Sequence, residues 1–300
     1  MSEDLLLSIY LHPPILQTAL AGKLGFLNRM RALLEPRGWR IEIRRSGPKA
    51  RAEAAGRPGY ALFNMERPTH DRALTFRLAY HYPYWRLERV AERWRWPIAN
   101  TVFHPESIEE GAAHRFAARL RARVLPGVTP VPAGRILIPL QGHLRRQRSF
   151  QSMSPLEMIR AAAGTGRPCT ATLHPKESYD AEDRAALDAL ARKHPNLTIG
   201  GDTARLLPAC AFVVTQNSGA GFDGLILGKP VVLFAQSDYH HVALNVAELG
   251  AEAAMERAAA HRPPVEKFLD WFLRRTSLDM MAADADARLL AAMKKGGWPV

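Results

Sequence analysis

The sequence contains few cysteines and no long apolar run. Cys169 and Cys210 are the only two cysteines among 300 residues, and each lies in an apolar stretch without the spacing of a metal site. We therefore expect two reduced core thiols, no metal centre and a cytoplasmic protein. The first apolar run stops at His12, and no basic residue precedes it. It is too short for a transmembrane helix and lacks the basic start of a signal peptide.

Two common site motifs are also missing. The dinucleotide-binding pattern of three spaced glycines is absent. Gln216 stands where the nucleophile motif of hydrolases has its first glycine. No segment matches an RNA-recognition signature, a zinc finger or a basic zipper. These absences argue against a Rossmann dinucleotide site, a serine hydrolase and a nucleic-acid partner.

Acidic residues are too few to balance the basic ones. The 41 lysines and arginines exceed the 29 aspartates and glutamates, so the formal net charge is +12. Such an excess suits anionic partners, namely nucleotide phosphates, acidic glycans or anionic lipid headgroups. An arginine-rich genome would produce the same balance.

Strands and helices alternate in two halves of the chain. The segment Pro126–Gly134 holds three prolines and two glycines, so it cannot continue a helix or a central strand, and we predict a linker there. We divide the chain into domains 1–130 and 131–300. Alternating strands and helices predict parallel sheets covered on both faces, and hence two Rossmann-like α/β domains.

The predicted elements of the first half begin with an apolar strand. Its strands are Leu5–Leu11, Trp39–Arg44 and Tyr60–Phe63, with a helix over Ile15–Leu34 and a surface loop over Ser46–Pro58. In the second half the strands are Arg135–Leu140, Cys169–Leu173, Leu197–Ile199, Ala211–Thr215 and Val231–Phe234. The helices there are Pro155–Ala163, Ala181–Lys193, Ala204–Leu207, Asp223–Leu227 and a helical end over Pro264–Lys295.

The clearest single unit is the βαβ segment from Phe212 to Tyr239. An apolar strand leads into the loop Gln216–Gly221, a helix follows, and Gly228-Lys229-Pro230 returns the chain to a second strand. Glycines allow a ligand to approach the backbone, and amides at a helix start attract anions. The loop therefore suits a phosphate, although Ser218 at this position also serves simply as a helix cap.

Polar residues follow several of the predicted strands at the point where each ends. Parallel α/β sheets bind ligands beyond the carboxyl ends of their strands, so these residues predict a ligand edge on each sheet and a cleft between the two. They are Gln141, His174, Lys176, Asn217 and Ser218 in the second half, and His12, Asn64 and Glu66 in the first.

The segment Leu74–Trp96 is rich in aromatic residues and arginines. Aromatic faces stack on sugar rings and arginines pair with carboxylates, so this segment either lines an acceptor surface or fills a helix–sheet interface. The residues in question are Tyr80, His81, Tyr82, Tyr84 and Trp85.

Three segments in the second half resemble the bacterial capsular polysaccharide biosynthesis family. In order they are LIPLQGHLRRQRSFQSMSPLEMI, TLHPKES and TQNSGAGFDGLILGKPVVLF. This family includes Kdo transferases that use CMP-Kdo, an activated acidic sugar, and its His-Pro motif is similar to that of bacterial sialyltransferases. The resemblance implies the GT-B architecture, in which two Rossmann-like domains face a cleft and C-terminal helices pack back. The first half is similar only in layout.

The resemblance implies a role for each matching residue. His174 would contact the donor phosphate and stabilise charge on the leaving nucleotide. Ser218 and the amides after it would hold the same phosphate. Asp223, in place of the family's usual glutamate, would accept hydrogen bonds from the ribose, whereas Lys229 belongs to the turn. The other donor-site residues would be Gln141, Lys176, Asn217, Gly219 and Gly221.

Two departures from the family's motifs leave the catalytic base unassigned. The loop Gly142–Ser149 contains no Asp or Glu, although the family has an acid there. Thr172 stands where a lysine is usual, and Lys176 is the expected substitute. Sugar transfer usually needs a carboxylate or another base. The candidates are His143, Glu66 and His12.

The resemblance implies a glycosyltransferase that needs no cofactor beyond its nucleotide-sugar donor. A CMP-linked acidic sugar is favoured over a UDP-sugar. The basic charge favours an anionic capsule polysaccharide or glycolipid as acceptor, and peripheral contact with the anionic inner membrane. Two alternatives stand beside it: a non-catalytic relative that binds nucleotide or glycan, suggested by the acid-free loop, and a nucleotide-sugar epimerase of the same fold.

Overall fold

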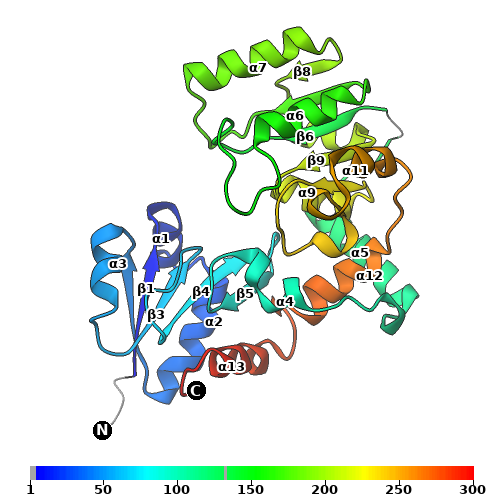
Figure 1. Ribbon diagram of the computed structural model, residues 1–300. Helices are drawn as coiled ribbons and strands as arrows, with labels where there is room; N and C mark the ends of the chain where they lie inside the picture. Colours follow the sequence, from blue (N-terminus) through cyan, green and yellow to red (C-terminus); the bar gives the residue numbers. More distant parts are fainter. Residues whose placement is uncertain (1–4, 132–133) are drawn as a thin grey trace. The chain divides into compact units, whose positions relative to one another are not determined.

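The computed structural model describes residues 5–131 and 134–300, which fold into two compact units (Figure 1). Unit 1 consists of the chain up to Ile98 together with Trp271–Val300, and unit 2 consists of Ala99–Asp270. Each unit is a helix-covered, mostly parallel sheet, which confirms the prediction of two Rossmann-like α/β domains. The cleft expected between them stays a prediction. Within the described residues, no helix is both long and apolar enough to cross a bilayer.

Unit 1 contains a six-stranded sheet in the order β12-β5-β4-β3-β1-β2. The first four strands along the chain pair in parallel, and β5 is antiparallel to both β4 and β12. The strands are β1 (Leu6–Leu11), β2 (Arg40–Arg45), β3 (Tyr60–Asn64), β4 (Ala73–Leu78), β5 (Tyr84–Glu88) and β12 (Leu278–Asp279).

Helices cover both faces of the unit 1 sheet, because successive residues of its inner strands place apolar side chains on opposite faces. Ile9 of β1 packs with Phe26 and Met30 on one face, whereas its neighbour Tyr10 stacks on Phe63 on the other. The first face carries α1 (Pro13–Leu20), α2 (Gly25–Leu34) and α13 (Ala285–Lys295), and the second carries α3 (Pro48–Ala54). Shorter turns are η1 (Glu35–Arg37), η2 (Arg93–Arg95), α4 (Pro97–Asn100) and the π-helix η6 (Asp270–Arg275).

Unit 2 contains a second six-stranded sheet in the order β11-β10-β9-β6-β7-β8, with every pair parallel. Its central strands are buried and mostly apolar, as expected of a sheet covered by helices on both faces. The strands are β6 (Ile136–Pro139), β7 (Cys169–Thr172), β8 (Leu197–Ile199), β9 (Phe212–Thr215), β10 (Val231–Leu233) and β11 (Leu244–Asn245).

The helices of unit 2 begin at well-defined polar caps. Ser154 forms a capping box with Glu157, and the side chains of Asp180 and Asp202 cap the next two helices. The helices are α5 (Glu110–Val124), α6 (Pro155–Gly164), α7 (Ala181–Lys193), α8 (Thr203–Leu206), α9 (Gly219–Ile226), α10 (Val246–Leu249), α11 (Ala251–Ala258) and α12 (Val265–Leu269), with the turns η3 (Pro105–Ser107), η4 (Leu207–Ala209) and η5 (His240–Val242).

The strand order reverses once in each sheet, and the reversal marks where ligands bind in such folds. In unit 1 the chain builds β2 on one side of β1 and β3 on the other. In unit 2 it builds β7 on one side of β6 and β9 on the other. Loops that leave such neighbouring strands in opposite directions open a crevice at their carboxyl ends. The two switch points are therefore β1/β3 and β6/β9.

The compact units divide the chain elsewhere than at residues 130 and 131. The predicted linker Pro126–Gly134, of which residues 132 and 133 lie outside the described part, belongs to unit 2, where the amide of Val131 donates to the carbonyl of Pro208 at 3.0 Å. The C-terminal segment belongs to unit 1, because Leu289, Met293 and Trp298 are buried in its core.

Three other predicted elements also differ from the structure. The helix expected over Ile15–Leu34 is two helices, separated where Gly22 adopts a left-handed φ of 67°. The loop expected over Ser46–Pro58 contains α3. The helical end expected over Pro264–Lys295 is interrupted by strand β12, which pairs with β5.

Candidate functional site

The loop between β9 and α9 ends in a capped helix at the switch point of unit 2. The Ser218 Oγ accepts a hydrogen bond from the amide of Ala220 at 3.3 Å, and the Ser218 amide donates to Thr215 Oγ1 at 3.4 Å. Ser218 is thus the N-cap of an eight-residue helix. The first amides of α9 carry the partial positive charge of a helix start, so this loop suits an anion.

Tyr239 explains why residue 221, the second glycine of this loop, is a glycine. Its ring is fully buried against Phe222, and its hydroxyl donates to the carbonyl of Ser218 at 2.9 Å. A Cβ added to Gly221 would lie 2.6 Å from this hydroxyl and 3.0 Å from a methyl of Thr215. Residue 221 is therefore a glycine because Tyr239 packs against it. The sequence shows no local sign of this contact, which joins residues far apart along the chain.

Other side chains of this loop brace it against its neighbours. The Asn217 Nδ2 donates to the carbonyl of Gln236 at 3.0 Å, and the Gln216 Nε2 donates to the carbonyl of Met153 at 3.0 Å. Asp223 is half-buried within α9, while Gly219 is exposed at its start. The loop is therefore held rigidly from both sides, and its exposed part is the start of the helix.

His174 follows β7 and has a fixed hydrogen-bonding pattern. Its Nδ1 accepts a hydrogen bond from the amide of Lys176 at 3.2 Å, and its own amide donates to the hydroxyl of Tyr179 at 2.9 Å. A neutral imidazole in this setting carries its proton on Nε2. That nitrogen is suited to donate to a phosphate oxygen.

Gln141 and Glu177 meet the loop after β6, which has no acid of its own. The Gln141 Oε1 is buried, and no described residue donates to it. A Cβ on Gly142 would overlap the carboxylate of Glu177, so the glycine allows this acid to lie against the loop. Glu177 is not among the residues predicted from the sequence. Its only local signal is that it directly follows Lys176 in the segment after the strand.

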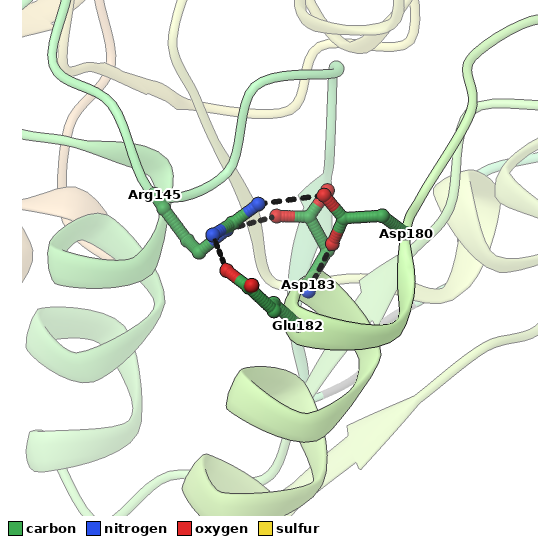
Figure 2. A network of polar contacts seen from close by, with 4 residues as sticks. All are labelled: Arg145, Asp180, Glu182 and Asp183. Carbon is green, nitrogen blue, oxygen red and sulfur yellow. Dashed lines mark hydrogen bonds and ion pairs between the residues drawn. The ribbon is translucent and has the colours of Figure 1, made fainter.

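Arg145 fastens this loop to the start of α7, as Figure 2 shows. Its Nη2 lies 2.6 Å from Asp180 and its Nε lies 3.0 Å from the buried Asp183, while Nη1 contacts Glu182. The hydrogen bond to Asp183, together with the charges of the other two acids, raises the pKa of Arg145. Because Arg145 pairs with three carboxylates at the start of α7, it positions the loop after β6.

A cavity of about 560 Å³ lies beside the Arg145 network. His143, with a left-handed φ of 61°, lines it together with Arg146, Lys176 and Glu177. Neither Arg146 nor Lys176 forms an ion pair with any described residue, in contrast to Arg145. The cavity thus brings two predicted site residues, His143 and Lys176, to one wall.

In unit 1 the predicted residues His12 and Glu66 meet at the β1/β3 switch point. The His12 Nε2 lies 3.4 Å from Glu66 Oε1, and half of the His12 side chain is exposed. The other carboxylate oxygen of Glu66 lies 3.4 Å from Arg51 Nη1 and accepts a hydrogen bond from the hydroxyl of Ser46. A histidine oriented by a fixed carboxylate is a common general base. Asn64 instead faces inward, where its side chain donates to the carbonyl of Phe76.

The aromatic segment after β4 mostly fills the core of unit 1. Trp85 stacks on Phe26 with the ring centroids 4.9 Å apart, and Tyr84 is buried beside it. Trp85 and Tyr84 therefore fill a helix–sheet interface and do not line an acceptor surface. Tyr82 is 53% exposed, and Tyr80 lies under the guanidinium of Arg93 at 4.7 Å.

The fold and these sites together define a class of protein: two Rossmann-like α/β units, each with polar side chains at its switch point. No family profile matches the sequence, and no curated protein matches it either. Among the described residues, no group of three metal-ligating side chains occurs. The structure does resemble several solved structures.

Two of these solved structures are of KpsC from Thermosulfurimonas dismutans. The beta Kdo 2,7 transferase matches with a TM-score of 0.47 and 14% identity, over 82% of this chain and 89% of that one. The beta Kdo 2,4 transferase matches with a TM-score of 0.47 and 17% identity, over 88% and 89%. The UDP-GlcNAc 2-epimerase from Neisseria meningitidis, solved with UDP-GlcNAc, matches with a TM-score of 0.40 and 11% identity, over 97% and 99%. All three TM-scores lie below 0.5, and all three identities lie below 20%.

Proposed function

We propose that this chain is a glycosyltransferase, which moves a sugar from a nucleotide donor to the hydroxyl group of a glycan or glycolipid. The observation that carries this proposal is the His12–Glu66 pair at the switch point of unit 1. Sugar transfer needs a base for the acceptor hydroxyl and positive charge at the leaving phosphate. The pair supplies the first requirement, and the rim of unit 2 suits the second.

The donor would bind at the switch point of unit 2. Its phosphate would accept hydrogen bonds from the first amides of α9 and from the Nε2 of His174. A CMP-linked acidic sugar is the favoured donor, with a UDP-sugar as the second choice. Arg146 and Lys176 line the neighbouring cavity, but Glu177, Asp180 and Asp183 line it as well, so the preference for an acidic sugar rests on the motif resemblance and on the formal net charge of +12.

The acceptor hydroxyl would be deprotonated by His12. The acceptor oxygen forms a bond to the anomeric carbon of the donor sugar, while the bond from that carbon to the phosphate oxygen breaks. The proton passes to His12, and the nucleotide leaves with the electron pair. Glu66 orients the imidazole and stabilises its positive charge. Ser46 and Arg51 already engage Glu66, which suits a supporting carboxylate better than a nucleophile.

The formal net charge supports the proposed acceptor and the proposed place of action. A formal net charge of +12 favours an anionic acceptor such as a capsule polysaccharide or a glycolipid. The same charge supports peripheral contact with the anionic cytoplasmic face of the inner membrane.

A transfer assay with matched histidine variants tests the base. His12→Gln and Glu66→Gln should each lower kcat/KM by about 10²–10⁴-fold, the usual contribution of general base catalysis. His104→Gln is the control, because His104 is also an exposed histidine paired with a glutamate, Glu106, at 2.9 Å, but it follows no strand. Equal rates for wild type and the His12 variant would remove the base from the proposal.

Nucleotide binding tests the donor site separately. CMP, UDP and CMP-Kdo are added in turn and thermal unfolding is followed, since a ligand at about 100 times its Kd adds about 2.7 kcal/mol. In an active enzyme His174→Ala should cost about 10²–10³-fold in rate. Binding without turnover on a broad acceptor panel would indicate the non-catalytic relative, and a changed sugar without acceptor would indicate the epimerase. The absence of both nucleotide binding and sugar transfer would contradict the proposal.

A further inference from the structure

Lys229 is a buried cation that no carboxylate neutralises among the described residues. Only 8% of it is exposed. Its Nζ donates to the carbonyl of Cys210 at 2.8 Å and to that of Val131 at 3.2 Å. These carbonyls occupy two of the three ammonium donors but carry no charge. Because burying an unpaired charge is costly, a position of this kind invites an anion.

Lys229 lines a cavity of about 350 Å³ in which every charged wall residue is basic. Arg167 and Arg262 line the same cavity, and its remaining wall residues are all uncharged. The Nη1 of Arg262 donates to the carbonyls of Ala259 and His261, both at 2.9 Å. This guanidinium is therefore held in place at the cavity, while Arg167 is exposed beside it.

This basic cavity (Arg167, Lys229, Arg262) lies at the edge of the unit 2 sheet opposite to the donor rim. Lys229 and Pro230 directly precede β10, Cys210 and Ala211 precede β9, and Arg167 precedes β7. The amino ends of parallel strands share one edge. The cavity is thus separate from Ser218 and His174, which follow the carboxyl ends of β9 and β7.

A neighbouring cavity of about 440 Å³ shares Lys229 and Arg262 but differs in charge. Glu110 and Glu266 line it as well, and Glu266 pairs with His114 at 3.0 Å. Carboxylates in the wall would repel an anion. The cavity without acids is therefore the better anion site of the two.

We propose that the basic cavity is a second anion site of unit 2, which binds a phosphate group. Two guanidiniums and one ammonium match a phosphate mono- or diester, because arginine forks bind two of its oxygens and lysine supplies a point charge. A volume of about 350 Å³ admits a small phosphorylated metabolite or the headgroup of a phospholipid. The site does not depend on glycosyl transfer, and its test measures binding alone.

Titration with inorganic phosphate at constant ionic strength tests the site by calorimetry. Arg167→Gln and Arg262→Gln should each weaken phosphate binding about tenfold, the loss expected for a charge-assisted hydrogen bond. Lys193→Gln, which removes one exposed charge at the end of α7 in the same unit, should leave it unchanged. Phosphate bound at the donor rim contributes equally to all variants, so only the difference between them reports on the basic cavity.

Lys229→Met serves as a third variant with its own check. It removes the charge but leaves two carbonyls without their donor, so its unfolding temperature is measured first. If it does not fold, the two arginine variants carry the test, because both side chains lie at the surface. Equal phosphate affinity in wild type, Arg167→Gln, Arg262→Gln and Lys193→Gln would overturn the proposal.

Vesicle binding distinguishes the two sources of the phosphate. Phosphatidylcholine vesicles are compared with and without phosphatidylglycerol in a sedimentation assay. Binding to the anionic vesicles that both arginine variants lose would assign a lipid headgroup. If no vesicles are bound but both arginine variants lose phosphate binding, the ligand would be a soluble phosphate ester.

Discussion

The hydroxyl of Tyr239 packs directly against Gly221 at the start of α9, so an added methyl group has no space there. We predict that Gly221→Ala lowers the free energy of unfolding by about 1–3 kcal/mol, the usual cost of overpacking a core. Either the buried Tyr239 ring or Thr215 of β9 must shift. Chemical denaturation followed by far-UV circular dichroism measures the change, because all six tryptophans lie in unit 1.

Gly164→Ala provides the matched control for this substitution. A Cβ at Gly164 would meet no atom within 4 Å, and alanine favours the helix by about 0.5–1 kcal/mol. Unit 2 should therefore keep or slightly gain stability. Equal effects of the two substitutions would show that Tyr239 does not determine the glycine at position 221.

His241 should make unit 2 sensitive to acid. Burial, together with the adjacent His240, lowers its pKa from 6.5 to about 4, although the hydrogen bond to the carbonyl of Thr101 opposes the shift. Below pH 6.5 the unfolded chain binds a proton that the folded unit refuses until about pH 4. This stability is therefore complete above pH 6.5 and is lost as the pH falls toward 4.

We expect a loss of about 1–2 kcal/mol across this range, a figure reduced for the partial exposure of the ring. Urea denaturation at several pH values measures it. His241→Phe should flatten the profile, because it removes the titrating ring while an aromatic ring still contacts Phe268. His104→Gln removes an exposed histidine as control. A profile unchanged in His241→Phe would assign the acid sensitivity to other groups.

At the scale of elements, the loop at residues 142–149 depends on α7 for its position. Leu144 anchors it in the core, and Arg145 joins it to three acids around the helix start. We predict that Arg145→Met speeds amide hydrogen exchange within the loop and leaves the global unfolding temperature nearly unchanged, because most of these charges are exposed.

Arg184→Met is the control for the loop, since Arg184 lies on the same helix and makes no ion pair with any described residue. If the loop positions the donor, Arg145→Met should also raise KM for the nucleotide sugar. Unchanged exchange in residues 142–149 would show that Leu144 alone holds the loop.

The same scale shows which elements a sequence reveals. The apolar strands β6, β7 and β9 and the capped helices α6 and α7 were predicted close to their observed bounds, because their patterns are local. Helix α3 was missed because its only buried residue is Ala54, so it has no apolar stripe. The interruption by β12 was missed because its two residues form a strand only through pairing with β5.

At the scale of the whole molecule, unit 1 is discontinuous and unit 2 is not. A fragment of residues 99–270 should therefore fold alone, with a cooperative thermal transition by circular dichroism. A fragment of residues 131–300 should not, because it lacks α5, whose Phe116 and Leu120 are buried in unit 2. Each lost side chain costs about 1.5–3 kcal/mol. Similar transitions for the two fragments would favour the boundary predicted from sequence.

Unit 1 should likewise require the end of the chain. Arg86 of β5 donates to the carbonyls of Phe272 and Thr276, and Trp298 is buried against Trp39 and Tyr60. These contacts join residues that are at least 186 positions apart along the chain. No local pattern announces them.

The candidate site divides in the same way between local and distant information. The polar residues after each strand could be identified from the residues alone, because a run of apolar side chains that stops at His12, Gln141 or His174 shows where a strand ends. Strand order, in contrast, depends on which segments pair across the chain. Only folding placed His12 beside Glu66, brought Glu177 to Gly142 and moved residues 271–300 into unit 1. The physical reason is that hydrophobic periodicity acts between neighbours in sequence, whereas burial and charge pairing act between neighbours in space.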